Sequence, residues 1–453
     1  MISNVYRRYK DDFRANTKLA IPIVLGQLGQ IATNIADNIM VAKLGPAHLA
    51  AVSLSVAIFI IFLIVGIGIS FSLPPLVAEA HSAKHHSRIG QYFKHSLIIN
   101  LSFAIISLIA MLLLIPMLGY MGQEQEVISL AKPYLQICAY SLIPMMMFQT
   151  LRCYADGMSE TLPPMIAMIA GNVLNIALNY MLIFGKLGAP ALGVAGAALG
   201  TLIARCVMIM ILVGLLIKWK DLWSYITGID YLSYQRALIK KMLSISIPVS
   251  LQLFFEVSAV AGVAILMGLL GKEAQAGHQI AINIASVPFL ICSGLGMAAS
   301  VRVGNQLGLK DSKGMYRAGV SNFIQVTFLM IIAGTLLYLL RGFLPSLYLD
   351  DPTVLSVAST LLIFAALFQI PDGLQVAILG ALRGAQDVNI PTLISFIAYW
   401  VIGIPIGCLL SFYFDIGPQG LWIGLVVGFA IAALLLQWRF RYIINRHYNT
   451  DES

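Results

Sequence analysis

Three acidic residues lie deep within long apolar stretches of this chain: Asp37, Glu256 and Asp372. A carboxylate inside a hydrocarbon layer is costly, and where one occurs it usually marks an ion or proton pathway. Arg205 is the only lysine or arginine at a similar depth, so it cannot neutralise all three acids. Uncompensated acids in such surroundings hold protons or bind cations. These positions therefore predict cation-linked or proton-linked chemistry.

Amide side chains at helical spacing accompany the acids. Residues three or four apart share one face of a helix, and clustered oxygen atoms suit a hard cation such as Na+. The amides are Gln27, Gln30 and Asn34 before Asp37; Asn172, Asn175 and Asn179 on another segment; Gln252 before Glu256; Gln279 and Asn283 on the next segment; and Gln369 and Gln375 around Asp372. A lone amide more often only bonds a neighbouring helix, so the carboxylates carry the functional prediction.

Two other residues modify this prediction. Pro371 is expected to break the helix beside Asp372, because proline removes a backbone donor. Arg205 lies about 20 Å from the nearer end of its segment at 1.5 Å per residue, which is too far for full contact with the interface. We expect Arg205 to pair with an acid or with helix carbonyls.

The composition places these residues in a membrane protein. Hydrophobic residues make up 59% of the chain and charged residues 11%, with a mean hydropathy of +0.87, whereas a soluble domain is about a quarter charged. A membrane-spanning helix needs about 20 apolar residues. Twelve such segments are predicted at 17–43, 49–80, 90–120, 128–155, 164–184, 190–218, 242–270, 275–308, 313–345, 352–383, 389–413 and 419–445. The fold class is all-α and polytopic.

The loop charges predict the orientation. With alternating loops, 22 lysines and arginines lie on the side of the N-terminus and only five on the other side. Cytoplasmic loops collect basic residues, so both termini are expected in the cytoplasm. The net charge of +8 is explained in this way, and nucleic acid binding is not expected.

The two halves of the chain repeat each other. Pro22 and Pro248 are 226 positions apart, and Pro163 and Pro391 are 228 apart. We predict two pseudo-symmetric six-helix lobes, 1–229 and 230–453, joined by a cytoplasmic linker at 219–241. Repeats of this kind are a device of transporters, in which the lobes rock around a site between them.

Other activities lack their motifs. The sequence has no GxxxxGK[ST] phosphate loop, HExxH run or Ser/His/Asp pattern, and these would mark ATP-driven transport or hydrolysis. The five cysteines are scattered singly, without the spacing of a zinc site. We therefore expect neither an enzyme nor an organic cofactor.

Three stretches resemble the multidrug and toxic compound extrusion (MATE) family: LAIPIVLGQLGQIATNIADNIMVAKLG, ADGMSETLPP and LRGAQDVNIP. The resemblance covers essentially the whole chain. Glu256 with Asp372 after a proline, and Asp37 with Asn175 and Asn179, match the NorM-like branch. The DinF-like branch would be expected to have an aspartate where this chain has Asn179.

The resemblance implies a multidrug efflux antiporter with a V-shaped cavity and alternating access, which exports amphipathic cationic drugs and dyes in exchange for Na+ or H+. It implies Na+ at Glu256 and Asp372, in a site to which we assign Gln279 and Asn283. Asp37, Asn175 and Asn179 would form a second site, linked to Na+ or protons. The weaker candidates for the substrate cavity are Asn34, Gln252, Gln369 and Gln375.

An alternative is a lipid-linked oligosaccharide flippase of the same wider superfamily. Such a flippase should carry several basic residues in its cavity and often fourteen helices, whereas this chain has one deep arginine and three deep acids. The antiporter is therefore preferred, as a multi-pass monomer in the bacterial inner membrane.

Overall fold

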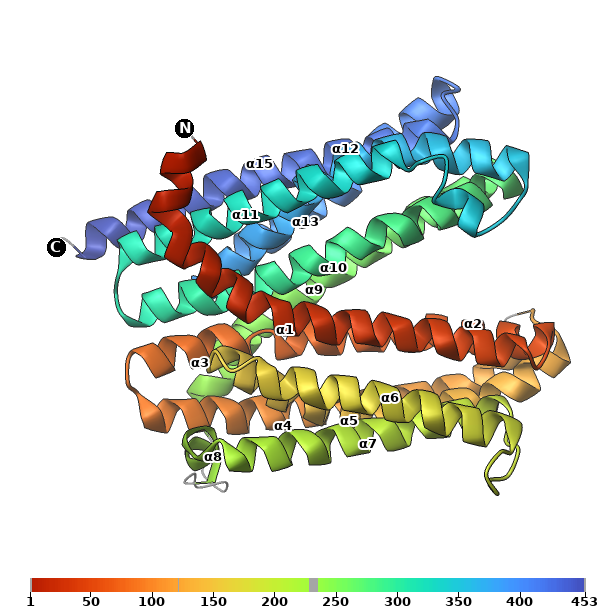
Figure 1. Ribbon diagram of the computed structural model, residues 1–453, viewed down its shortest axis with the longest axis horizontal. Helices are drawn as coiled ribbons and strands as arrows, with labels where there is room; N and C mark the ends of the chain where they lie inside the picture. Colours follow the sequence, from red (N-terminus) through yellow and green to blue (C-terminus); the bar gives the residue numbers. More distant parts are fainter. Residues whose placement is uncertain (1, 121, 228–234, 452–453) are drawn as a thin grey trace. The chain divides into compact units, whose positions relative to one another are not determined.

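The structure is a computed structural model that describes residues 2–120, 122–227 and 235–451. Within these ranges the regular structure is helical (Figure 1). The helices are α1 (Ile2–Ala42), α2 (Pro46–Ser70), α3 (Leu73–Ser82), α4 (His86–Leu114), α5 (Gln125–Gly157), α6 (Leu162–Phe184), α7 (Val194–Lys218), α8 (Lys220–Thr227), α9 (Arg236–Leu269), α10 (Lys272–Gly308), α11 (Ser312–Leu339), α12 (Pro352–Gly384), α13 (Asn389–Phe396), α14 (Ile404–Cys408) and α15 (Pro418–Asp451), with short segments η1 (Ile115–Tyr120), η2 (Pro345–Leu347), η3 (Ile397–Gly403) and η4 (Leu409–Tyr413). Part of the predicted linker, 228–234, lies outside the described residues.

Eleven helical stretches in the described part of the chain are long and apolar enough to cross a membrane. They correspond to eleven of the twelve predicted segments, and the remaining one, 128–155, is α5. This helix of 33 residues contains two interior prolines and packs against α2, α4 and α7. An interior helix contacts little lipid, so α5 tolerates a more polar sequence than its neighbours.

Three local predictions differ from the structure. The segment predicted at 49–80 is two helices, because a turn at Phe71 and Ser72 separates α2 from α3, whose first turn is formed by prolines. The first helix begins at Ile2 rather than at residue 17. The predicted break at Pro371 is wrong: α12 runs without interruption from Pro352 to Gly384, since neighbouring helices compensate for a proline in a membrane helix.

The chain forms two compact units. We call Pro22–Ser250 the N-terminal unit, and Met1–Ile21 together with Leu251–Ser453 the C-terminal unit. The division falls inside α1 and α9, whereas the lobes expected from the sequence are divided in the linker. The first halves of these two helices thus belong to the unit formed by the other half of the chain.

Ionic contacts explain why the start of α1 belongs to the C-terminal unit. The Asp12 carboxylate accepts a bond of 2.7 Å from Arg302 on α10 and one of 3.0 Å from Arg317 on α11. Arg302 also donates to the Asn16 side chain over 2.7 Å. Asp12 and Asn16 lie on the buried face of α1, one helical turn apart. Charge-assisted bonds of this length are strong, so they fix α1 to α10 and α11.

The start of α9 is held in the N-terminal unit by serines. Ser246 donates to the Ser72 hydroxyl over 2.8 Å, and Ser250 donates to the Val65 carbonyl over 3.0 Å. A methyl group on Gly68 would lie 2.5 Å from the Cα of Ser250. Only glycine therefore permits this close contact between α2 and α9.

The predicted repeat is visible in the backbone. Gly45 and Gly271, 226 positions apart, both precede a helix with φ near +120°, at 124° and 118°. Lys84 and Lys310 share the left-handed conformation, with φ of 56° and 55°. Left-handed lysines are uncommon, so their recurrence at the same offset supports two related halves.

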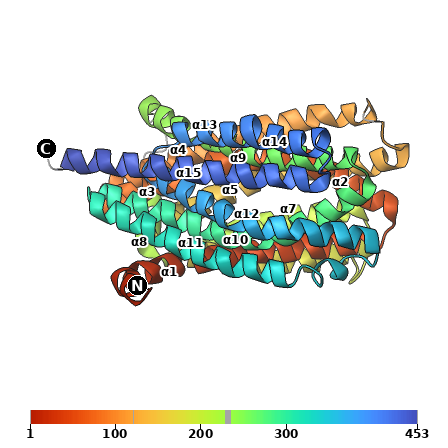
Figure 2. The ribbon, with the colours of Figure 1, turned by 90° about the horizontal axis from the view of Figure 1, so that it is seen from above.

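The helix at 389–413 is irregular. It begins as α13, widens into the π-helical segment η3, returns to α-helix in α14 and widens again in η4. α15 runs alongside it in the C-terminal unit (Figure 2). π-helical turns are rare and occur frequently at functional sites, and these turns carry residues of the site described next.

Candidate functional site

Two of the three predicted acids lie together in the C-terminal unit. Glu256 is on α9 and Asp372 is on α12, and Asp372 is within electrostatic range of Glu256. Asp372 is only 5% exposed. Two carboxylates in a low-dielectric interior repel each other unless a proton or a cation lies between them. This pair is therefore suited to binding and releasing positive charge.

Neighbouring side chains orient the Asp372 carboxylate. The Gln375 amide donates to Asp372 Oδ1 over 3.2 Å. The Tyr399 hydroxyl in turn donates to Gln375 Oε1. Both Gln375 and Tyr399 are buried. Since Gln375 is one helical turn after Asp372, the polar stripe predicted on this helix acts as a support for the acid.

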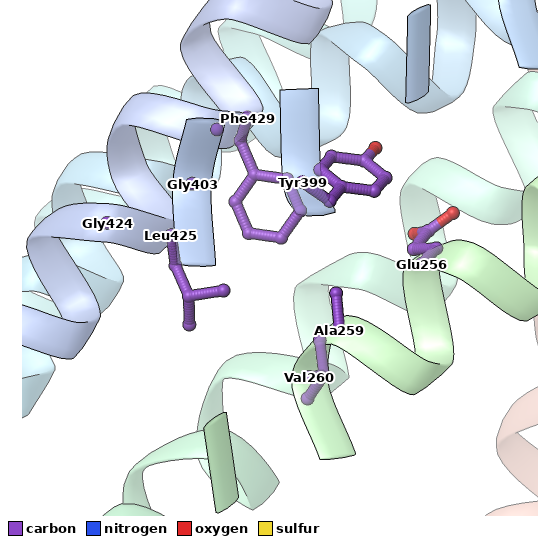
Figure 3. Close-up of a pocket in the computed structure, with 9 residues that line it drawn as sticks. Glu256, Ala259, Val260, Tyr399, Gly403, Gly424, Leu425 and Phe429 are labelled. Carbon is purple, nitrogen blue, oxygen red and sulfur yellow. The ribbon is translucent and has the colours of Figure 1, made fainter. Parts of the chain in front are cut away.

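A small pocket adjoins Glu256 (Figure 3). Its wall is formed by Glu256, Ala259, Val260, Tyr399, Gly403, Gly424, Leu425, Gly428 and Phe429. The space that the centre of a water molecule can occupy in this pocket is about 10 Å³. This is about enough for one water molecule. The pocket is large enough for an ion or a water molecule and too small for a drug.

The donor set fits a cation that is carried rather than a resident metal. Within the described ranges no group of three or more His, Cys, Asp or Glu side chains is arranged around a common centre. Two carboxylates, with the Gln375 side chain bonded to one of them, offer the hard oxygen ligands that Na+ prefers. The same carboxylates can also take up a proton.

The other amides predicted for this half bond elsewhere. Gln279 donates to Asn283 over 3.1 Å on its own helix. Gln369 donates to the Ala285 carbonyl over 3.2 Å, which links α12 to α10. Gln252, on α9 one turn before Glu256, is 3% exposed. The Gln369 contact is of the kind that holds helices together, whereas the Gln279–Asn283 contact lies within α10.

The third acid, Asp37, is the centre of a cluster in the N-terminal unit. The Asn179 amide donates to Asp37 Oδ1 over 2.6 Å and to Asn175 Oδ1 over 3.2 Å. Asn175 then donates to the Thr201 hydroxyl over 3.1 Å. The cluster thus joins α1, α6 and α7. Thr201 was missed by the sequence analysis, because a single threonine in an apolar helix carries no signal.

The oxygen of Asn179 is the unused acceptor of this cluster. Asn179 Oδ1 is buried and has no donor within the described residues. Together with the Asp37 carboxylate it offers oxygen atoms to a cation or to a protonated partner. Asn34, predicted on the same face of the first helix as Asp37, accepts from Gln30 on its own helix over 3.4 Å.

Arg205 lies in the same unit, and its partners there are neutral groups rather than an acid. Its guanidinium donates to the Ser141 hydroxyl over 2.5 Å and to the Ser141 carbonyl over 3.5 Å. It also lies 5.1 Å from the ring centre of Phe59. Tyr134 is within electrostatic range of both Arg205 and Asp37. The expected pairing with a helix carbonyl is therefore present, and the ion pairs found in the described residues do not include Arg205.

Asp156 is a further buried acid, which the sequence did not single out. Asp156, near the end of α5, is 1% exposed and lies 3.6 Å from Arg152 one turn earlier. The sequence places it at the edge of its apolar segment, so it was not distinguished from loop acids. Its basic neighbour makes it a structural ion pair rather than an uncompensated acid.

Comparison with known proteins identifies the same family as the sequence resemblance. The MatE family model matches residues 22–181 and 248–409, two stretches that begin 226 positions apart, like the prolines of the repeat. The chain is 32% identical to the multidrug resistance protein NorM of Vibrio vulnificus over 449 residues, which is 98% of each chain. It is 34% identical to the multidrug resistance protein PmpM of Pseudomonas aeruginosa over 441 residues, 95% of this chain and 91% of PmpM.

Solved structures agree on the fold. A crystal structure of a MATE protein in the bent conformation has a TM-score of 0.90 at 22% identity and covers 98% of both chains. An outward-facing MATE multidrug resistance transporter has a TM-score of 0.88 at 23% identity, with 96% of both chains covered. The predicted all-α polytopic fold is thereby confirmed. The chain belongs to the multidrug and toxic compound extrusion family as a NorM-like member, and is a multi-pass membrane transporter rather than an enzyme.

Proposed function

We propose that this protein is a secondary active efflux antiporter, which exports amphipathic organic cations in exchange for Na+ or H+ by alternating access. The observation that carries the proposal is that two carboxylates, Glu256 on α9 and Asp372 on α12, lie within electrostatic range of each other. The names of the relatives, multidrug resistance proteins from several bacteria, support the export of drugs. We place the protein in the bacterial inner membrane as a monomer with both termini in the cytoplasm.

The exchange follows from charge neutralisation. When the coupling ion is bound, the charge of the acid pair is reduced and the pair no longer attracts an organic cation. When the ion leaves, the two acids regain their negative charge and favour a cationic substrate. A membrane potential of about 100 mV is worth about 2.3 kcal/mol per charge moved, so ion entry can drive export.

The N-terminal cluster is proposed as a second site, linked to protons or Na+. Asp37 supplies the charge there, Asn179 donates to its carboxylate, and Asn175 accepts from the same Asn179 amide. The amides Asn34, Gln252, Gln369 and Gln375, together with Gln279 and Asn283, remain the candidates for contacts with the substrate or with the coupling ion.

Gradient experiments on reconstituted vesicles test the proposal. Ethidium efflux is measured with a Na+ gradient at equal pH and, separately, with a pH gradient without Na+. Efflux driven by either gradient supports antiport and identifies the ion. Absence of efflux under both gradients would contradict it and would favour the flippase alternative, which transport of a lipid-linked oligosaccharide would then test.

Substitution of Gly200 by alanine tests the N-terminal cluster. The added methyl group would lie 2.1 Å from Asn179 Oδ1, so the amide must move and its bond to Asp37 must lengthen. We expect gradient-driven efflux to fall about tenfold, since a displaced bond to a charged group costs about 1.5 kcal/mol or more.

Gly214→Ala is the matched control in the same helix, because no atom lies within 4 Å of its added methyl group. This control should keep the original rate. Equal efflux in the two variants would show that the Asn179–Asp37 contact does not contribute to transport.

A further inference from the structure

One turn of a π-helix contacts both acid-bearing helices of the C-terminal unit. The segment η3 (Ile397–Gly403) contains Tyr399 and Trp400 in succession. Tyr399 donates to Gln375 on α12, and Trp400 Nε1 donates to the Phe255 carbonyl on α9 over 3.2 Å. Successive residues of a helix point in clearly different directions, so a single turn can contact two different helices.

Each of these bonds ends next to an acid. On α12, the Gln375 amide that accepts from Tyr399 also donates a hydrogen bond to Asp372 over 3.2 Å. On α9, Phe255 is the residue immediately before Glu256. Because Tyr399 and Trp400 lie on one turn, they link the position of Asp372 along α12 to the position of Glu256 along α9.

Further contacts near the same turn make this arrangement rigid. The ring of Phe255 packs against Phe396, with centres 5.0 Å apart. The ring of Tyr399 packs edge-on against Phe429 of α15 at 5.6 Å. A methyl group on Gly403 would lie 3.1 Å from the carbonyl oxygen of Gly424, so small residues allow the wide turn to lie against α15.

The pocket beside Glu256 lies at this turn. Figure 3 shows the Tyr399 ring and the Glu256 side chain as lining residues from two different helices. The π-helical turn thus contributes one wall of the small space next to an acid and also supports the other acid through Gln375.

We propose that Tyr399 and Trp400 are positioning residues for the coupling-ion site: their π-helical turn holds α9 and α12 at the spacing that lets Glu256 and Asp372 share one cation or proton. The inference rests on the proposed antiport function. Neither residue is required to touch the ion, and the binding of the drug does not depend on them.

The test removes one donor at a time. Tyr399→Phe deletes only the hydroxyl, and Trp400→Phe deletes the indole N–H. Tyr413→Phe is the control from the same irregular helix, 76% exposed, and Trp438→Phe is the control from α15, 64% exposed. For each variant the half-saturating Na+ concentration at fixed pH and the pH dependence without Na+ are measured by ethidium efflux, together with half-saturation by ethidium.

We expect each donor deletion to raise the half-saturating concentration of the coupling ion about 5- to 10-fold, which corresponds to the loss of one hydrogen bond. Half-saturation by ethidium and both control variants should change less than about twofold. The double variant should lose less than the product of the single effects, because both bonds hold the same turn.

Two results would overturn the inference. One is unchanged ion dependence in both folded variants, and the other is a parallel loss of ion affinity, drug affinity and thermal stability, which would indicate a general structural role. The two proposals remain distinguishable. If Glu256→Gln abolishes coupled efflux but the donor deletions leave the ion dependence unchanged, only this inference fails. If the unmodified protein shows no ion-driven efflux, the proposed function fails and this inference fails with it.

Discussion

Replacement of Glu256 by glutamine should abolish gradient-driven efflux, with a fall of about 100-fold or more in rate. Glutamine has nearly the same size but cannot ionise, so the pair with Asp372 loses one of its two charges. For a cation bound beside a carboxylate, Coulomb's law gives about 4 kcal/mol at a separation of about 4 Å and an effective dielectric constant of about 20. Part of this is offset because less charge has to be desolvated, which leaves the expected 100-fold effect.

The control for Glu256 is Glu273→Gln at the start of α10. The Glu273 side chain is 43% exposed, and within the described residues it forms one ion pair, a 3.8 Å contact with Lys272. Exposed pairs of this kind contribute little, so this variant should transport normally. Normal coupled efflux by Glu256→Gln, at equal protein levels in the vesicles, would remove the acid pair from the mechanism.

Substitution of Gly380 by alanine should destabilise the C-terminal unit by about 2–3 kcal/mol. The added methyl group would lie 2.0 Å from the carbonyl oxygen of Gly296, and this neighbour is backbone, which cannot rotate away. Overpacking of a close contact costs about 1–3 kcal/mol. The contact joins α10 to α12, the helix that carries Asp372, so thermal unfolding of the purified protein should begin at a lower temperature.

Gly262→Ala on α9 is the matched control for Gly380. Its added methyl group would meet only the end of the Ile404 side chain, at an ordinary 3.9 Å. Alanine is a better helix former than glycine by about 1 kcal/mol, so the melting temperature should stay the same or rise slightly. If Gly380→Ala melts at the temperature of the unmodified protein, the close packing of α10 and α12 is not as described.

The contacts of α1 and α9 suggest a common plan for the two halves. In each half the first helix begins in the compact unit of the other half, and it is fixed there by polar contacts: Asp12 with Arg302 in one case and Ser246 with Ser72 in the other. A proline lies near each point of division, Pro22 in α1 and Pro248 in α9. These are the places at which each long helix lacks one backbone hydrogen bond.

The sequence by itself determined the class of the protein and the positions of its acids. Hydropathy locates membrane helices because burial in lipid depends on local composition and not on the partners of a helix. The cost of a buried carboxylate likewise makes Asp37, Glu256 and Asp372 conspicuous without any structure. The helical period predicts that Asn175 and Asn179 share one face, and the structure joins them by a hydrogen bond from Asn179, which also donates to Asp37.

Only the tertiary structure decided which side chains these residues contact. Tyr399 and Trp400 are ordinary aromatic residues in the sequence, and their roles depend on a π-helical turn that no periodicity predicts. Arg205 pairs with Ser141 rather than with an acid, because the packing of α5 against α7 places the Ser141 hydroxyl beside the guanidinium. Contacts of this kind depend on which helices pack together and at what height. That information is spread over the whole chain and is not contained in any one segment.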